Sequence, residues 1–187
     1  MTAAPPQKKV LHVGCSIHTP DKLHETFRGP DWTEVRLDIN PAVEPDIIAS
    51  ITDMNMVNSG SFHALYSSHN LEHLHPHEVP LALREFFRVL HPQGFALITV
   101  PDIQQVAEYV AADKAEEPVL MTDKGPIAPL DILYGFRSFL ERGNLFMAHN
   151  FGFTAGTLAA ALKAAGFATV NVERDGVFNL WATASPS

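Results

Sequence analysis

The stretch FHALYSSHNLEHLHPHEVPLALREFFRVLHPQGFALITVPD, residues 62–102, decides the fold of this chain. It predicts a strand at residues 62–67, a polar loop, an amphipathic helix at about residues 78–90, a Pro-Gln-Gly turn and a second strand at residues 95–100. Parallel strands cannot be joined by a tight turn and need a long crossover connection, which is usually a helix. The stretch is therefore predicted to be a βαβ unit of a parallel sheet.

The alternation of strands and helices continues on both sides of this unit. Further elements are predicted before it, namely strands at 10–13, 34–37 and 46–49 and a short helix at 21–27. The C-terminal part is predicted to form a helix and a two-stranded hairpin, at 154–165, 169–174 and 178–183. This order favours an α/β fold with a mostly parallel sheet, covered on both faces, and one reversed strand near an edge.

Residues 103–150 break this rhythm. They contain a predicted helix at 104–112, a Pro- and Gly-punctuated loop at 117–129 and a helical piece near 130–140. Because no repeat or interdomain linker appears in the sequence, residues 1–187 are predicted to form one domain with a single core. The large apolar side chains of the insertion suit either a lid over a substrate or the surface of a homodimer.

Composition restricts the class of function. The formal net charge is −8, which argues against broad electrostatic attraction to nucleic acid phosphates. Cys15 is the one cysteine, so an internal disulfide is excluded and a reducing compartment fits. The N-terminal apolar run is too short for a signal peptide, and no segment approaches the roughly 20 apolar residues that span a bilayer. We therefore expect a cytoplasmic protein that binds neither nucleic acid nor membrane.

The amino-acid sequence of residues 71–102 resembles the sequence motifs of a known family. Leu-Glu-His, followed by Arg-Glu-Phe-Phe-Arg-Val-Leu-His-Pro-Gln-Gly and a strand ending in Pro-Asp, is similar to text in class I S-adenosylmethionine-dependent methyltransferases of the type 11-like group. The resemblance covers nearly the whole chain from Lys9. It implies a Rossmann-like, doubly wound sheet of seven strands in the order 3-2-1-4-5-7-6, with S-adenosylmethionine as the cofactor. The helix that commonly precedes the first strand in that family is missing.

The turn after the first strand is a candidate cofactor contact. Ligands of open α/β sheets bind outside the carboxyl ends of the strands where strand order reverses, here between the first and fourth strands. Gly14, Cys15 and Ser16 occupy that turn, and the resemblance implies that they hold the methionine portion of the cofactor. A plain tight turn at Gly14 and a small buried side chain at Cys15 are the alternative interpretations.

Asp38 ends the second predicted strand, about where dinucleotide-binding folds place an acid that binds ribose hydroxyls. A carboxylate can accept hydrogen bonds from two hydroxyl groups at once. By the resemblance, Ile39 packs beside the adenine ring. The alternative is that Asp38 only caps the loop that enters Asn40-Pro41.

Two further pairs complete the expected cofactor site. Asp53 and Met54 resemble the motif that binds the edge of adenine, although an ordinary Asx turn explains them equally well. Ser67 and Ser68 end the fourth strand, where the family contacts the amino group of the cofactor, and serines also form loops routinely.

The chain differs from the family's sequence motifs at three positions. Ser16 and His18 stand where later glycines of the first motif are usual, and His63 replaces a usual acid. These departures motivate an alternative function, in which a methyltransferase-fold protein has lost cofactor binding and acts as a partner or scaffold subunit. A nicotinamide-dependent enzyme is disfavoured because G-x-G-x-x-G spacing is absent after the first strand.

The histidine-rich stretch is a possible metal site. His69 to His73 matches H-x-x-E-H, in which two imidazoles on one helical face bind zinc. Pro76 and Pro80 leave little room for such a helix, and no third ligand is apparent downstream, so no metal is predicted.

The resemblance instead implies that His69, just after the fourth strand, and His149, before the Phe-Thr helix start, face the site, and both are candidate general bases for methyl transfer to a small molecule because imidazole titrates near neutral pH. For each of them, a histidine that only fixes its own loop by hydrogen bonding is the alternative.

Overall fold

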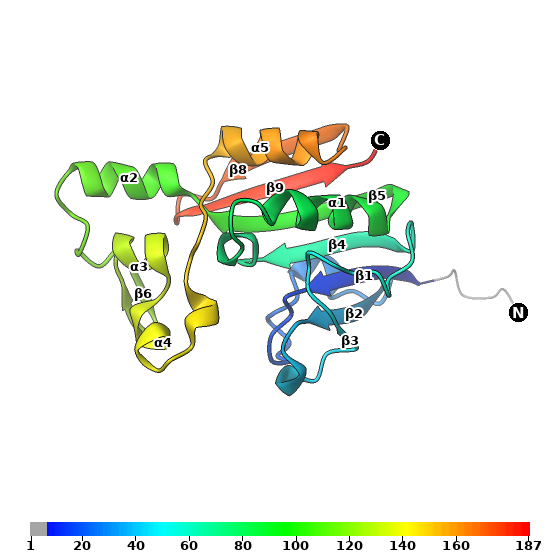
Figure 1. The fold of residues 1–187 in the computed structure, drawn as a ribbon, viewed down its shortest axis with the longest axis horizontal. Helices are drawn as coiled ribbons and strands as arrows, with labels where there is room; N and C mark the ends of the chain where they lie inside the picture. The colour runs from blue at the N-terminus through cyan, green and yellow to red at the C-terminus, as the bar shows by residue number, and fades with distance from the viewer. Residues whose placement is uncertain (1–6) are drawn as a thin grey trace, which may run out of the picture.

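The computed structural model describes residues 7–187, and a seven-stranded sheet forms its centre (Figure 1). Its strands are β1 (Lys8–Val13), β2 (Trp32–Asp38), β3 (Ile47–Ile48), β4 (Phe62–Ser68), β5 (Leu90–Pro101), β8 (Thr169–Arg174) and β9 (Asn179–Ser185). Their spatial order is β3-β2-β1-β4-β5-β9-β8, and within this sheet β9 runs opposite to the other six strands. Counted within this sheet only, the order is 3-2-1-4-5-7-6, so the predicted fold class is confirmed.

The central βαβ unit forms as predicted, with one irregularity. The helix α1 (Val79–Val89) leads directly into β5, which begins at Leu90 and not at residue 95. Leu90 pairs with Phe62 and Phe95 pairs with Ala64, so the longer strand bulges at the Pro-Gln-Gly turn. A side chain at Gly94 would lie 2.9 Å from the carbonyl oxygen of His63, which explains the glycine there.

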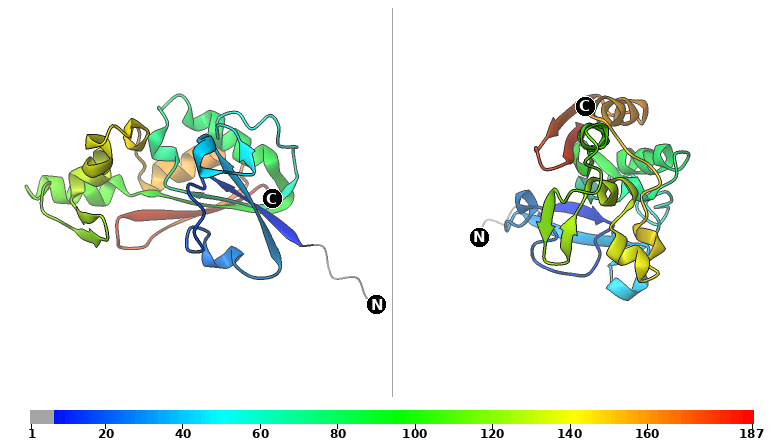
Figure 2. Two further views of the ribbon diagram at one scale, coloured as in Figure 1. Left: turned by 90° about the horizontal axis from the view of Figure 1, so that it is seen from below. Right: turned by 90° about the vertical axis from the view of Figure 1, so that its left-hand side faces the viewer.

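The helices α1 and α5 (Ala155–Ala164) cover one face of the sheet (Figures 1 and 2). Leu83 and Phe86 of α1 and Leu158 and Leu162 of α5 are fully buried against this face, at the spacing of a single helical stripe. Thr154 caps α5 as expected, because its hydroxyl accepts a hydrogen bond from the amide of Thr157.

The opposite face is covered by irregular chain. The predicted helix at residues 21–27 is reduced to the single 3-10 turn η1 (Glu25–Phe27), which lies below the sheet in the left view of Figure 2. Phe27 packs there against Trp32, Tyr66 and Phe95, with ring centroids 5.0 to 6.0 Å away. On this side of the sheet, a cluster of aromatic side chains therefore covers the strands in place of a helix.

Residues 103–150 form a lobe beyond the carboxyl ends of the parallel strands (Figure 1). Its elements are α2 (Ile103–Ala111), β6 (Leu120–Thr122), β7 (Gly125–Ile127), α3 (Pro129–Tyr134), α4 (Arg137–Glu141) and η4 (Leu145–Met147). The segment expected to be a loop at residues 117–129 contains the β6–β7 hairpin. The expected helical piece at 130–140 is interrupted at Gly135, whose φ is +100° and where a Cβ would lie 2.2 Å from the carbonyl oxygen of Met147.

A buried carboxylate holds this lobe together. Asp131 is 4% exposed and accepts hydrogen bonds from the amide of Ala128 at 2.9 Å and from Nε of Arg137 at 2.7 Å.

Among residues 7–187, no helix combines the length and the apolar character that crossing a bilayer requires.

Candidate functional site

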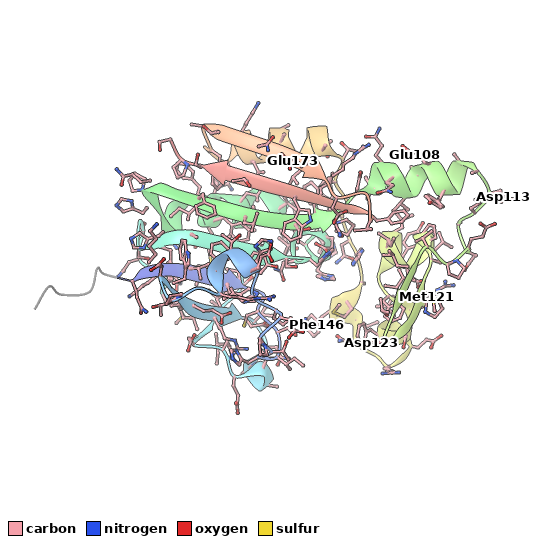
Figure 3. The ribbon with its side chains drawn as sticks, turned by 180° about the vertical axis from the view of Figure 1, so that it is seen from behind. Glu108, Asp113, Met121, Asp123, Phe146 and Glu173 are labelled. Atoms are coloured by element: carbon pink, nitrogen blue, oxygen red, sulfur yellow. The ribbon has the colours of Figure 1, made fainter. Side chains whose placement is uncertain are left out.

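A cleft of about 960 Å³ opens at the carboxyl ends of β1, β2 and β4, where the strand order reverses. The loops after these strands form one wall, and Leu145, Phe146 and Met147 of the lobe contribute to the other. Figure 3 shows Phe146 between the body of the sheet and the outer hairpin that carries Met121 and Asp123. The structure brings six of the residues expected from sequence into this cleft: Gly14, Ser16, Asp38, Ile39, Ser68 and His69.

Asp38 lies at the end of β2 and lines the cleft. Its Oδ2 accepts a hydrogen bond from the amide of Ser16 at 2.8 Å, and its Oδ1 accepts one from the amide of Asn40 at 2.9 Å. The carboxylate therefore organises both neighbouring loops. Each oxygen has two acceptor lone pairs, so one on each remains for a ligand's hydroxyl groups.

Gly14 is required by a close approach within the protein itself. Its φ is +59°, and a Cβ would lie 1.8 Å from Oδ1 of Asn70. Nδ2 of Asn70 donates to the carbonyl oxygen of Val13 at 3.0 Å and to Oγ of Ser67 at 3.1 Å. Asn70, which the sequence analysis missed, thus ties the loop after β4 to the tip of β1.

Arg36 explains how a glycine-poor loop keeps its shape. Ser16 has a φ of +56°, in the left-handed region that favours glycine. The guanidinium of Arg36 donates to the carbonyl oxygens of Ser16, Val43 and Glu44, which joins the loops after β1 and β2. No sequence pattern indicates this role, because Arg36 is only a polar position in a short predicted strand.

Two expected contact residues lie beneath the cleft surface. Cys15 is 1% exposed, and this burial raises the pKa of its thiol to about 11. Ser67 is also fully buried, and its hydroxyl accepts from Asn70. Neither side chain lines the cleft, so any contact they make with a ligand runs through the main chain.

The structure does not bring Asp53 and Met54 into the cleft. The amide of Met54 donates to Oε2 of Glu85 at 2.7 Å, and the Asp53 carboxylate accepts from the amide of Asn55 at 3.3 Å, as an Asx turn does. Ser50 and Ile51 line the cleft in their place.

Glu85 and Arg88 fix this loop from α1. They belong to the Arg-Glu-Phe-Phe-Arg motif, whose purpose was not apparent from the sequence. The contact spans 31 residues of chain and forms only when α1 packs beside residues 54–57.

The two candidate bases lie in different cavities. His69 faces the main cleft, whereas His149 lines a smaller cavity of about 240 Å³ together with Ile132, Tyr134 and Phe151. Nδ1 of His149 donates to the carbonyl oxygen of Ile132 at 2.7 Å. Burial lowers the pKa of His149 below its ordinary value.

His69 is held by a buried acid. Its φ is +53°, so residues 69–73 do not form the helix that a zinc-protease signature needs. Its Nδ1 lies 3.1 Å from Oε1 of Glu72. Burial alone would lower the pKa of His69, but the hydrogen bond and the negative charge of Glu72 outweigh it and raise that pKa.

Comparison with known proteins supports what the topology and the cleft indicate. The family model described as a methyltransferase domain matches residues 12–98. A solved protein of Pyrococcus horikoshii OT3 is 16% identical with a TM-score of 0.64, and the alignment covers 97% of this chain and 83% of that one. A TehB-like SAM-dependent methyltransferase of Corynebacterium glutamicum is 13% identical with a TM-score of 0.56, covering 98% of this chain and 83% of that one.

A third solved structure contains ligands. It is the 1,6-didemethyltoxoflavin-N1-methyltransferase of Burkholderia thailandensis with bound 1,6-didemethyltoxoflavin and S-adenosylhomocysteine. It is 16% identical with a TM-score of 0.52, and the alignment covers 95% of this chain and 70% of that one. No curated protein sequence matches this chain.

The sheet topology defines a Rossmann-like α/β protein, and its cleft lies at the strand ends where the strand order reverses. Residues 12–98 match the model of a methyltransferase domain, and the chain shares its fold with solved S-adenosylmethionine-dependent methyltransferases, so it is similar to the class I family of these enzymes. S-adenosylmethionine is the cofactor of this family.

Proposed function

We propose that this chain binds S-adenosylmethionine in the cleft at the ends of β1, β2 and β4 and methylates a small-molecule acceptor. The observation that carries the proposal is Asp38, a carboxylate that ends β2 at the switch point and keeps free lone pairs toward the cleft. The small-molecule complex of the Burkholderia thailandensis neighbour supports that class of acceptor.

The residues of the cleft fit the three parts of this cofactor. Asp38 accepts hydrogen bonds from the ribose hydroxyls, and the main chain at Gly14, Cys15 and Ser16 lies beside the amino-acid tail. Ile39, whose side chain is 61% exposed in the cleft, offers an apolar surface to the adenine ring. Ser68 and the main chain of Ser67 border the place of the amino group.

When bound, S-adenosylmethionine would supply an electrophilic methyl group, which would pass to a lone pair of the acceptor as its bond to sulfur breaks and a neutral thioether is left. The protein's part is to hold the acceptor and to exclude water. His69 faces the cleft and is the proposed base for an acceptor that must lose a proton. His149 takes that part only for an acceptor that extends into the smaller cavity.

We also propose that residues 103–150 act as the lid of this single-domain protein. Leu145 and Phe146 are 71% and 84% exposed and both line the cleft, so a bound ligand would bury apolar surface that is now exposed to water. The alternative is that this surface joins two copies of the chain in a homodimer.

A calorimetric titration with S-adenosylmethionine and S-adenosylhomocysteine tests the proposal. Replacing Asp38 by alanine is expected to weaken binding about 10- to 100-fold, because a hydrogen bond to a charged group contributes about 1.5–3 kcal/mol. Asp38→Asn keeps one acceptor oxygen and serves as the milder variant if alanine unfolds the loop. Asp31→Ala, at an exposed position before β2, is the matched control and should bind as the unaltered chain does.

A second candidate function is a partner or scaffold subunit that does not turn over cofactor. It is favoured by one observation, the Asn70 side chain that already occupies the approach to Gly14. The same titration separates the two functions. No heat at high micromolar concentrations of both ligands supports the scaffold, and product that binds more tightly than S-adenosylmethionine supports catalysis.

A further inference from the structure

Three metal-ligating side chains meet at the junction between the lobe and the sheet. Glu72 and His73 come from the turn η3 (Leu71–His73) after β4, and His149 comes from the segment that leads back from the lobe. One ligand atom from each lies within 4.8 Å of the others. These residues are 77 positions apart at the extremes, so only the tertiary fold assembles the cluster.

Glu72 carries a buried oxygen that has no hydrogen-bond partner. The residue is 1% exposed, and its Oε1 lies 3.1 Å from Nδ1 of His69. Within residues 7–187, no donor lies within hydrogen-bonding reach of its Oε2. A buried carboxylate oxygen without a donor or cation is costly, so such an atom marks a site that a further group completes.

The two histidines already present free ring nitrogens. Nδ1 of His73 lies 3.0 Å from the carbonyl oxygen of Ala148, and Nδ1 of His149 lies 2.7 Å from that of Ile132. A carbonyl oxygen only accepts, so each Nδ1 must carry the proton and each neutral ring keeps the lone pair of Nε2. Metal-bound histidines typically show this second hydrogen bond, which fixes the tautomer and the ring orientation.

Main-chain hydrogen bonds hold the two segments together independently of any ion. The amides of Asn150 and Phe151 donate to the carbonyl oxygen of Glu72 at 2.8 and 3.1 Å. Nδ2 of Asn150 donates to the carbonyl oxygen of His73 at 2.8 Å. The rings of His73 and His149 are therefore kept close, with centroids 5.0 Å apart.

We propose that Glu72, His73 and His149 bind one divalent first-row transition-metal ion, of which zinc is the representative. Two imidazoles and a carboxylate suit such ions, and three protein ligands leave a further coordination position open. Ligand atoms about 2.1 Å from a tetrahedral ion lie about 3.4 Å apart, so small side-chain rotations close the cluster around it. The inference goes beyond methyl transfer, and it uses a ligand set different from the His69–His73 pair of the sequence motif. An ion on Nε2 of His149 would take the lone pair that a base needs, so His69 would then be the candidate base.

The ion would cross-link the lobe to the loop after β4. His73 lines the main cleft and His149 lines the smaller cavity, so the site lies in the wall between them. Its chemical role is to fix that wall and to offer the open position to an oxygen or nitrogen of a ligand.

The test is a titration of the full-length chain, stripped of metal by chelation, with zinc chloride and with cobalt chloride. One ion is expected to bind per chain, with a rise in melting temperature and the intense visible absorption of four-coordinate cobalt. His149→Ala and the isosteric Glu72→Gln should each weaken zinc binding by at least about 100-fold. Since Glu72→Gln preserves the packing, it stays informative even if His149→Ala fails to fold.

His75 and His77 give the matched control. They are exposed, and their rings stack with centroids 5.8 Å apart, so the pair could bind zinc independently of the cluster. The double variant His75→Ala/His77→Ala should bind zinc as tightly as the unaltered chain. Loss of binding in that variant, or undiminished binding in Glu72→Gln, would overturn the proposal. Titration of the same variants with S-adenosylhomocysteine reports separately on cofactor binding, so failure of the metal proposal can be told from failure of the proposed function.

Discussion

Replacing Arg88 by alanine is expected to lower the free energy of unfolding by about 2–4 kcal/mol. The guanidinium of Arg88 joins α1 to the loop after β3. It donates to both carboxylate oxygens of Glu85 at 2.6 and 2.8 Å, to the carbonyl oxygen of Val57 at 2.7 Å and to that of Met54 at 2.8 Å. Alanine leaves these acceptors without their donor.

The magnitude follows from the kind of contact that is lost. A hydrogen bond from a charged donor contributes about 1.5–3 kcal/mol net, and Arg88 makes such bonds to two main-chain oxygens. The ion pair with Glu85 adds less, because the two side chains are 30% and 18% exposed and water screens them. In a domain of this size, about 1 kcal/mol shifts the melting temperature by about 2–4 °C, so a drop of roughly 4–16 °C is expected.

The assay is thermal and urea unfolding followed by circular dichroism. Arg84→Ala is the control, because Arg84 has the same side chain on the same helix but points to solvent. That variant should stay within about 0.5 kcal/mol of the unaltered chain. If Arg88→Ala and Arg84→Ala unfold at the same urea concentration, the hydrogen bonds of Arg88 do not stabilise the loop after β3, and the predicted loss of stability is wrong.

Two further predictions concern the first loop of the cleft. Gly14→Ala should lower the melting temperature strongly, because the new Cβ would clash with Asn70 and a φ of +59° strains alanine. Asn70→Ala should restore part of this loss, which a double-mutant cycle measures. Purely additive effects of the two substitutions would exclude the steric cause. Cys15 should react with iodoacetamide at pH 8 more than about 100-fold more slowly in the folded chain than in urea, since burial raises the pKa of its thiol to about 11; equal rates would show that this thiol is accessible.

Several parts of the fold follow from local sequence alone. The apolar stripe of α1 and the capping threonine of α5 involve residues three or four positions apart, so the pattern can be read directly. The Asp175-Gly176 pair likewise predicts the turn between β8 and β9. By contrast, the break at Gly135 depends on contact with Met147, and no local pattern signals that contact.

The site divides in the same way. That Gly14, Asp38 and Ser68 lie together was foreseeable, because all carboxyl ends of parallel strands reach the same edge of a sheet and the order of strands fixes the crevice. The sequence could not show that the amide of Met54 is taken by Glu85, because that bond depends on how α1 packs.

The sequence by itself therefore determined the class of fold, the edge of the sheet that holds the cleft and the acid that faces it. Only the tertiary structure decided which polar groups are already satisfied and which remain free. His149 lies close to Glu72 because main-chain hydrogen bonds hold the segment that returns from the lobe against η3. The path of this segment also places His149 in the smaller cavity, whereas His69 lies in the main cleft. Periodicity and spacing record the neighbours of a residue along the chain, whereas these contacts depend on the path of 77 residues through space.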